Sequence, residues 1–275
     1  MDIQYTGYQI KQLSETELSK LYNNEYSTEG FKVNEYLIVE DAAHKIIDYF
    51  YFNGEKFQQV KYPVLGNDFT GQMKPRNPQQ YCAMDLIKNQ KIPIKLITGN
   101  FGSGKSMMCI IGALEALQKG QFDRIVFVRN NVQVKDTDQL GALPGDMYEK
   151  TLPYVMPFAD HCGGVDGIKQ LIEEDKLEVI PLGFLRGRSI RNSIIYSMES
   201  ENLTKQHIQL MMGRVDEGSQ LWLDGDIKQR DKVAFEKSQG LEKMIEKLSG
   251  EKLFGYVHLV KSERSEVARM ADLLD

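Results

Sequence analysis

The segment from residue 94 to residue 117 constrains the fold more than any other part of the chain. It reads "IKLITGNFGSGKSMMCIIGALEAL", which is a short apolar run, a glycine-bearing loop and a long apolar stretch of helical composition. Residues 99–106 match G-x-x-x-x-G-K-[ST], a pattern that a chain of this length contains by chance with a probability of roughly one per cent. A strand, this loop and a helix in that order predict a phosphate-binding loop.

Each position of the loop has a chemical reason. Glycines let the backbone wrap an anion with its N–H groups pointing inward, and the start of the helix adds partial positive charge. Lys105 is predicted to reach the β- and γ-phosphates of ATP, and the Ser106 hydroxyl to ligate Mg²⁺. A glycine-rich turn with an exposed lysine is the alternative. The predicted cofactor-binding residues are Gly99, Asn100, Phe101, Gly102, Ser103, Gly104, Lys105 and Ser106.

The region from Asn77 onward has the pattern of an α/β fold. Asn77 can cap a helix whose first turn contains Pro78. Short apolar runs then alternate with helical stretches, which argues for a mostly parallel sheet covered on both faces. Apolar residues make up 41 % of the 275 residues, enough for one large domain with a small appendage. The predicted strands are residues 94–98, 124–128, 177–180, 193–198, 220–224 and 255–260.

The first 66 residues predict a small accessory module of antiparallel β structure. Ser14 and Glu17 have the spacing of a capping box and predict a short helix. Three strand-like runs follow at residues 35–40, 45–52 and 55–62, and Asn53-Gly54 predicts a two-residue hairpin turn between the last two. The segment "LGNDFTGQMKPRN" reads as a linker. We therefore predict an accessory module over residues 1–66 and an ATPase domain over residues 67–275.

Composition indicates the cellular compartment of the protein and the kinds of partner it can bind. The three cysteines and four histidines are scattered, which argues against a disulfide framework and a zinc site. No segment has the length of a signal peptide core or a membrane span, so we expect a cytoplasmic protein with no membrane partner. The net charge of −5 means that any contact with nucleic acid depends on local basic clusters.

The strand at residues 193–198 ends unusually for a phosphate-loop enzyme. Such a strand commonly ends in Asp-Glu, the Walker B pair, whereas this one ends in Met198 and Glu199. Glu199 is predicted to orient or activate the attacking water. Loss of a carboxylate that orients magnesium and its waters costs about 10- to 100-fold, or roughly 1.4 to 2.7 kcal/mol, so we expect slowed hydrolysis that Met198→Asp would speed up. Asp224 and Asp226 lie at the end of the next strand, and one of them could compensate for the missing acid, but the sequence does not place them relative to this site.

The order of several motifs resembles that of the PhoH-like ATPases. These are "PRNPQQ", "GNFGSGKS", "LGALPGDMYEKTLPYVMPFADH", "IPLGFLRGRSIRNSII", "ENLT", "GDIKQ" and "KSERS". The closest likeness is to the helicase half of PhoH proteins that carry an N-terminal PIN ribonuclease domain, over about residues 33 to 275. It implies a RecA-like core related to superfamily 1 helicases, ATP hydrolysis, RNA binding or unwinding, and assembly into homo-oligomeric rings. Residues 1–32 are too few for a PIN domain, so nuclease activity is not carried over.

The resemblance also assigns roles to single residues. Gln80 would contact adenine, Arg129 would lie near the nucleic-acid path, Gln229 would sense the γ-phosphate, and Arg264 would act as an arginine finger across a subunit boundary. Each of three residues has a plainer alternative: Gln80 could satisfy backbone groups of its own helix, Arg129 could form a surface ion pair, and Arg264 could be solvated. The predicted catalytic residues are Lys105, Glu199, Gln229 and Arg264.

The densest basic segment is "FLRGRSIRN", which contains Arg186, Arg188 and Arg191. Phosphate contacts need a local cluster of this kind, so we expect these three residues and Arg129 to contact single-stranded RNA or another nucleic acid. A solvated loop is the alternative.

Two functions therefore compete. The first is a ring-forming, RNA-directed ATPase and helicase. The second is an oligomeric scaffold or regulatory module that binds ATP with negligible hydrolysis, which Met198 favours. A small-molecule kinase is less well supported, because no arginine-rich lid insertion is apparent.

Overall fold

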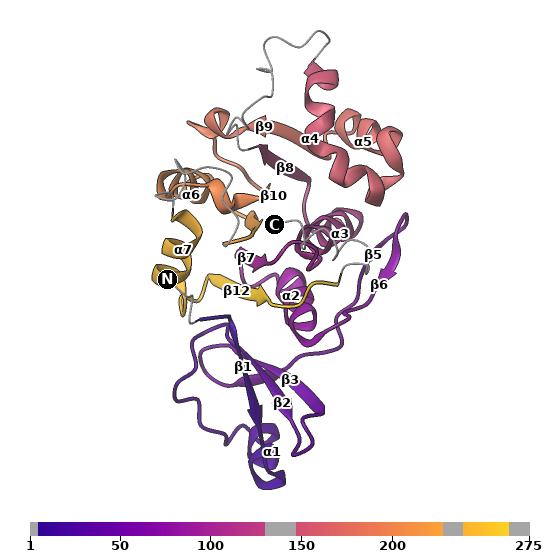
Figure 1. Cartoon of the computed structure of the whole chain (residues 1–275). Helices are drawn as coiled ribbons and strands as arrows, with labels where there is room; N and C mark the ends of the chain where they lie inside the picture. The colour runs from indigo at the N-terminus through magenta and orange to yellow at the C-terminus, as the bar shows by residue number, and fades with distance from the viewer. Residues whose placement is uncertain (1–4, 130–146, 228–238, 264–275) are drawn as a thin grey trace, which may run out of the picture. The chain divides into compact units, whose positions relative to one another are not determined.

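A computed structural model describes residues 5–129, 147–227 and 239–263 of the chain (Figure 1). Contacts between Cα atoms divide the chain into two compact units. The first unit comprises residues 1–64, 74–105 and 242–275, and the second comprises residues 65–73 and 106–241.

The N-terminal part of the first unit is a four-stranded sheet in the order β1-β2-β3-β4. Strands β2, β3 and β4 are antiparallel, as the sequence predicts. Strand β1 was not predicted and pairs with β2 in parallel, so the sheet is mixed. Helix α1 begins after a capping box formed by Ser14 and Glu17, which confirms that prediction. The bounds are β1 (Tyr8–Gln12), α1 (Glu15–Tyr22), β2 (Tyr36–Glu40), β3 (Ile46–Phe52) and β4 (Phe57–Gln59).

The turn between β3 and β4 differs from the predicted two-residue hairpin. Phe52 pairs with Phe57, so four residues connect the strands. The Asn53 side chain accepts hydrogen bonds from the backbone N–H groups of Glu55 and Lys56, each at 2.9 Å. This side-chain bonding competes with a tight turn and lengthens the loop. Gly54 still takes the positive φ that a turn requires, at 97°.

The predicted linker before Asn77 contains a short hairpin. Strands β5 (Leu65–Asn67) and β6 (Gly71–Met73) pair antiparallel, and Leu65 is fully buried. The segment interpreted as a linker thus contains a short hairpin, which the sequence analysis did not predict. Strands of three residues are too short to show a period of alternation, which is why the pattern does not reveal them.

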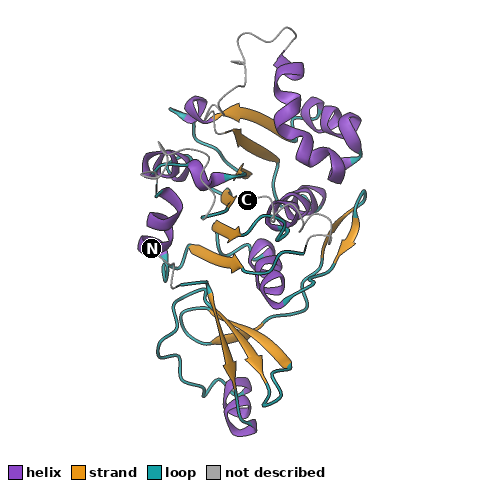
Figure 2. Cartoon of the chain, viewed as in Figure 1, coloured by secondary structure: helices purple, strands orange, loops and turns teal. Residues whose placement is uncertain are grey.

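The second sheet has six strands in the order β12-β7-β11-β10-β8-β9 and confirms the predicted parallel architecture (Figure 2). Strand β12 pairs with β7, and β11, β10, β8 and β9 pair in succession, each of these pairs in parallel. All six predicted strands are present within two residues of their predicted ends. Their bounds are β7 (Ile94–Gly99), β8 (Arg124–Arg129), β9 (Leu177–Pro181), β10 (Ser193–Ser197), β11 (Gln220–Gly225) and β12 (Phe254–Leu259).

Helices connect these strands, as expected for a parallel sheet. Asn77 caps α2 by accepting a hydrogen bond from the Gln80 N–H, and α2 packs against β7 and β12. In the second unit α4 packs against α5, and α5 contacts β9. None of the helices in the described part of the chain is long and apolar enough to cross a membrane. The helical bounds are α2 (Pro78–Lys88), α3 (Lys105–Gln118), α4 (Met147–Cys162), α5 (Gly164–Glu173), η2 (Leu182–Leu185), η3 (Ser200–Asn202), α6 (Lys205–Met212) and α7 (Gly240–Leu248).

Within the first unit, the N-terminal sheet is attached to β12 and α2 through polar and aromatic contacts. The Asn34 side-chain amide donates to the carbonyl oxygens of Glu251, Lys252 and Phe254 at 3.3, 3.0 and 2.9 Å. The His258 N–H donates to the Thr6 carbonyl at 2.9 Å. On α2, the Tyr81 ring stacks on Tyr49 with centroids 3.7 Å apart.

Candidate nucleotide-binding site

The loop from Gly99 to Ser106 follows β7 and opens α3, in the place that the sequence predicts. Gly102 and Gly104 have φ of 75° and 86°, a region that favours glycine. A Cβ atom on Gly99 would lie 2.7 Å from the Leu259 carbonyl oxygen and 2.9 Å from the Ser103 hydroxyl oxygen. The three glycines are therefore required by the shape of the loop. Phe101 is exposed, whereas Ser103 and Lys105 are buried.

The first turn of α2 contacts the loop through the side chain of Gln80. The Gln80 side-chain amide donates to the Ser103 carbonyl at 2.9 Å, and its oxygen accepts from the Arg76 N–H at 2.9 Å. The Gln80 side chain thus bonds backbone groups that lie outside its own helix, and its contact with adenine stays a prediction. The Glu263 N–H donates to the Gly102 carbonyl at 3.0 Å. A hydrogen bond from Asn77 holds the pKa of the Glu263 carboxyl below its ordinary value.

The hydroxyl that ends the motif contacts a carboxylate that the sequence did not place. The Ser106 Oγ donates to Asp224 Oδ1 at 3.2 Å. Asp224 lies on β11 and is fully buried. The Tyr196 hydroxyl donates to its other oxygen, and the Glu199 N–H donates to Oδ1 at 3.2 Å. Residues that lie far apart in the sequence thus converge on one carboxylate within the second unit.

Glu199 follows the end of β10 in an uncommon backbone conformation. Its φ and ψ are 50° and 51°, in the left-handed region that residues other than glycine seldom adopt. The hydrogen bond from its N–H to Asp224 helps to hold this conformation. Its side chain is exposed, and Met198 beside it is half-buried. The predicted catalytic carboxylate is therefore accessible.

Glu201 is an acidic residue of this region that the sequence analysis did not single out. Its carboxylate accepts from the Asp226 N–H at 3.2 Å. A Cβ atom on Gly225 would lie 2.9 Å from the same carboxylate oxygen, so glycine allows this approach. Burial raises the pKa of Glu201 to about 7. The sequence shows an ordinary polar residue here, because only packing distinguishes it from a solvated glutamate.

Two arginines of the predicted basic cluster are paired with acids of the second unit. Arg188 donates to both oxygens of Glu178, at 2.6 and 2.9 Å. Arg191 Nε donates to Asp216 at 2.9 Å. The bond from Arg188 lowers the pKa of the Glu178 carboxyl, and a hydrogen bond from Ser189, together with that from Arg191, lowers the pKa of Asp216.

The remaining predicted basic contacts differ in exposure. Arg186 is exposed and follows Phe184, whose side chain is 71 % exposed. Arg129 is buried, and its guanidinium carbon lies 4.0 Å from the centre of the Tyr154 ring. Gln229 and Arg264, the predicted γ-phosphate sensor and arginine finger, lie outside the described residues.

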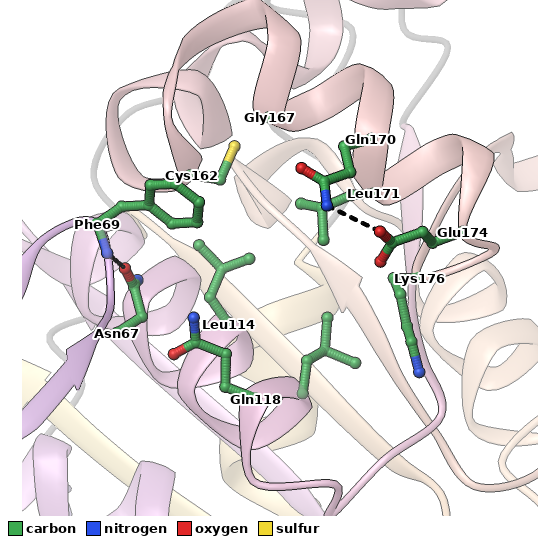
Figure 3. Close-up of a pocket in the computed structure, with 11 residues that line it drawn as sticks. Asn67, Phe69, Leu114, Gln118, Cys162, Gly167, Gln170, Leu171, Glu174 and Lys176 are labelled. Carbon is green, nitrogen blue, oxygen red and sulfur yellow. Dashed lines mark hydrogen bonds between the residues drawn. The ribbon is translucent and has the colours of Figure 1, made fainter.

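A separate cavity of about 220 Å³ lies in the second unit among α3, α5 and the β5–β6 hairpin (Figure 3). The Phe69 ring and the Cys162 sulfur lie at one side of it, and a hydrogen bond joins Gln170 to Glu174 at another. None of the predicted site residues lines it. This cavity is therefore distinct from the phosphate loop.

The residues present fit a magnesium nucleotide. The loop glycines leave the backbone open to an anion at the start of a helix, where phosphate groups bind readily. Because the Ser106 hydroxyl donates its hydrogen to Asp224, its lone pairs remain for a cation. Mg²⁺ is usually bound by one or two protein oxygens together with substrate phosphates. Ser106 provides such an oxygen, and Asp224 accepts the hydrogen bond of its hydroxyl.

The parallel sheet and the glycine-lysine-serine loop together define a phosphate-loop nucleoside triphosphatase fold of the RecA-like type. Comparison with family models gives the particular family. Residues 72–272 match the model of the PhoH-like protein family, and the chain belongs to that family.

Several proteins named PhoH2 or PhoH-like protein are similar in sequence to this chain. The chain is 29 % identical over 290 residues to protein PhoH2 of Bacillus subtilis, an alignment covering 99 % of this chain and 65 % of that protein. It is 31 % identical over 201 residues to protein PhoH2 of Mycolicibacterium smegmatis, covering 72 % and 46 % of the two chains. It is 32 % identical over 190 residues to a PhoH-like protein of Synechocystis, covering 67 % and 56 %. The chain thus spans about half to two thirds of the length of these relatives.

Proposed function

We propose that this protein binds ATP with Mg²⁺ and hydrolyses it, and that single-stranded RNA and assembly into a ring regulate the hydrolysis. The observation that carries the proposal is the hydrogen bond from the loop hydroxyl of Ser106 to the buried carboxylate of Asp224. A structural turn has no need of a buried acid at its serine. A phosphate loop that binds magnesium needs an acid that orients this serine.

The chain's own residues account for the binding step. The backbone N–H groups of the loop and the ammonium group of Lys105 receive the phosphates, which concentrates positive charge where the terminal phosphate lies. Ser106 would supply a hydroxyl oxygen to Mg²⁺. When bound, Mg²⁺ draws charge from the phosphate oxygens.

Glu199 is the residue proposed to prepare water for attack. It follows the end of β10 with an exposed side chain, and the hydrogen bond from its N–H to Asp224 fixes its backbone. A carboxylate held in this way can accept a hydrogen bond from water and orient it. Gln229 and Arg264 complete the proposed machinery as γ-phosphate sensor and as arginine finger from a neighbouring subunit.

The RNA contact is proposed to centre on the loop at η2. Arg186 supplies an exposed positive charge and Phe184 an exposed ring, the two groups that single-stranded nucleic acid uses most. Arg188 and Arg191 would contribute once redirected from Glu178 and Asp216. Arg129, the last residue of β8, would contribute at the C-terminal end of that strand.

Calorimetry with ATP and Mg²⁺ tests the binding step. Lys105→Ala is expected to weaken ATP binding at least tenfold, because Lys105 supplies a point charge to the terminal phosphates. Lys119→Ala is the matched control, since Lys119 lies just beyond the other end of α3 in an ion pair with Glu115. Equal ATP affinity in the parent protein and in Lys105→Ala would overturn the proposal.

ATP turnover with and without single-stranded RNA separates the ATPase from the alternative scaffold. Met198 at the strand end is the observation that favours the scaffold. The ATPase predicts turnover that RNA changes and that Glu199→Gln removes. The scaffold predicts ATP-dependent oligomers in light scattering with negligible turnover under both conditions.

A further inference from the structure

We propose that Asp224 is the metal-positioning residue of this site and replaces the carboxylate that β10 lacks at Met198. In this chain the acid lies on the neighbouring strand, β11, and serves the same site. This inference rests on the proposed binding of magnesium and ATP, and it names the residue that adapts this chain to the loss of the Walker B aspartate.

The register of the two strands supports the replacement. Strands β10 and β11 pair in parallel with Ser197 opposite Leu223. The residues that follow this pair are Met198, the first residue beyond the end of β10, and Asp224, which lies on β11. Neighbouring strands lie about 4.8 Å apart, so the carboxylate is displaced by roughly the width of one strand. Parallel strands present residues at one level on the same face of the sheet, which keeps the acid on the side where the aspartate would be.

The contacts of Asp224 match those expected of a residue that orients a metal ligand. Its Oδ1 accepts from Ser106 Oγ at 3.2 Å, which leaves the lone pairs of the hydroxyl available for a cation. Partners of this kind, which hydrogen-bond the groups around a metal, fix the orientation of those groups. The Tyr196 hydroxyl and the Glu199 N–H hold the carboxylate itself in place.

Burial gives a second, independent argument. Asp224 is fully buried, and Tyr196 beside it is fully buried as well. A carboxylate at such a depth is costly unless it is held by several hydrogen bonds, so its presence calls for a function. The bond from the Glu199 N–H also joins the metal side of the site to the residue proposed to handle water.

Binding of Mn²⁺ to the complex with ADP, followed by electron paramagnetic resonance, tests the inference without any turnover. Asp224→Asn is expected to weaken Mn²⁺ binding by about 10- to 100-fold. Its affinity for ADP in EDTA should stay within about threefold of the parent, because the phosphates are bound by the loop. The amide keeps the volume of the carboxylate and still offers one acceptor oxygen, which favours folding.

Asp216→Asn is the matched control. It removes the same charge just before the opposite end of β11, where the acid pairs with Arg191. It is expected to leave Mn²⁺ affinity unchanged. The swap variant Met198→Asp/Asp224→Asn returns the acid to β10 and is expected to recover most of the lost Mn²⁺ affinity, which a purely structural role for Asp224 would not produce.

Several results would overturn the inference. A folded Asp224→Asn with the Mn²⁺ affinity of the parent overturns it alone, as does a swap variant that stays as weak as Asp224→Asn. A parent protein that binds no nucleotide overturns it together with the proposed function. If melting curves show that Asp224→Asn is unfolded, Asp224→Glu carries the test, because it keeps the charge and moves it by one methylene. Unchanged Mn²⁺ affinity in Asp224→Glu then counts against the inference, and a tenfold loss supports it.

Discussion

The strand ends of β10 and β11 and the basic loop at residues 182–191 show opposite relations between sequence and space. At the strand ends, Ser106, Tyr196, Glu199 and Asp224 are separated by up to 118 positions and meet at one carboxylate. In the basic loop, arginines within six residues of each other pair with separate acids, Glu178 and Asp216. Folding assembles the first site and disperses the second. A cluster in the sequence is therefore a weaker sign of function than convergence in the structure.

The largest expected effect lies at the assembled site. Glu199→Gln should lower ATP turnover by about 10²- to 10⁴-fold, the usual contribution of general base catalysis. ATP affinity should remain within a few fold, because Glu199 is proposed to act on water rather than on the bound phosphates. Single-turnover kinetics combined with equilibrium binding measures both quantities. Full turnover in this variant would mean that the strand ends do not form the catalytic edge.

A smaller effect is expected at the position where the sequence lacks an acid. Met198→Asp should change turnover by less than about tenfold, below the full gain of 10- to 100-fold that an absent metal-orienting carboxylate would allow. Asp224 already contacts Ser106, and a second carboxylate beside it adds repulsion. Turnover at saturating Mg²⁺ checks this, with the melting temperature as a control for folding. A gain of 100-fold would show that Asp224 does not fill the role.

The paired state of the basic loop predicts a pH-dependent contribution to stability. Arg188 lowers the pKa of Glu178 in the folded state, so the pair stabilises the fold above the unfolded pKa near 4.5 and this contribution is lost as pH falls through the folded pKa. Glu178→Gln should cost about 1 kcal/mol at pH 7 and progressively less below about pH 4. Urea unfolding at several pH values measures this free energy.

Glu173→Gln provides the comparison for that experiment. Glu173 forms an exposed pair with Lys169 at 3.8 Å, in contrast to the two short bonds between Glu178 and Arg188. Its substitution should change the free energy of unfolding by less than about 0.5 kcal/mol at any pH. Equal losses in the free energy of unfolding for the two variants would contradict the view that the pair of Arg188 and Glu178 stabilises the fold.

The smallest expected effect distinguishes the arginines of the basic loop from each other. Arg186→Ala should flatten the slope of log affinity against log salt for single-stranded RNA by about 0.7, the value for one phosphate contact. Arg188→Ala should flatten it less, because Glu178 already accepts its hydrogen bonds. Fluorescence anisotropy at a series of salt concentrations gives the slopes. Equal flattening would show that RNA releases Arg188 from its acid.

The sequence predicted those features that depend on local pattern. The six strands of the parallel sheet, the caps at Ser14 and Asn77 and the loop at residues 99–106 each follow from spacing and residue type. The β5–β6 hairpin was missed because strands of three residues are too short to show an alternation, and strand β1 was not singled out although Tyr8 and Ile10 alternate with polar residues. Asn53 lengthened its turn through side-chain bonds that a two-residue signal does not show.

The candidate site was predictable only in part, for a physical reason. The motif identified Lys105 and Ser106, and the resemblance identified Glu199, but the partner of Ser106 depends on strand register. Register follows from how whole strands pack, so the neighbour of Met198 could not be found from the end of β10 alone. The pairing of Arg188 with Glu178 escaped prediction for the same reason, since the acid lies on β9.

The contacts of Asn34 make the end of the N-terminal module a poor place to truncate the chain. Cutting before residue 67 removes the amide that serves three carbonyl groups at residues 251, 252 and 254, and also removes the Thr6 carbonyl that accepts from His258. Strand β12 would then present unpaired backbone groups along an edge, which is a template for aggregation. Insoluble material from such a shortened chain would report a broken strand edge and would say nothing about the phosphate loop.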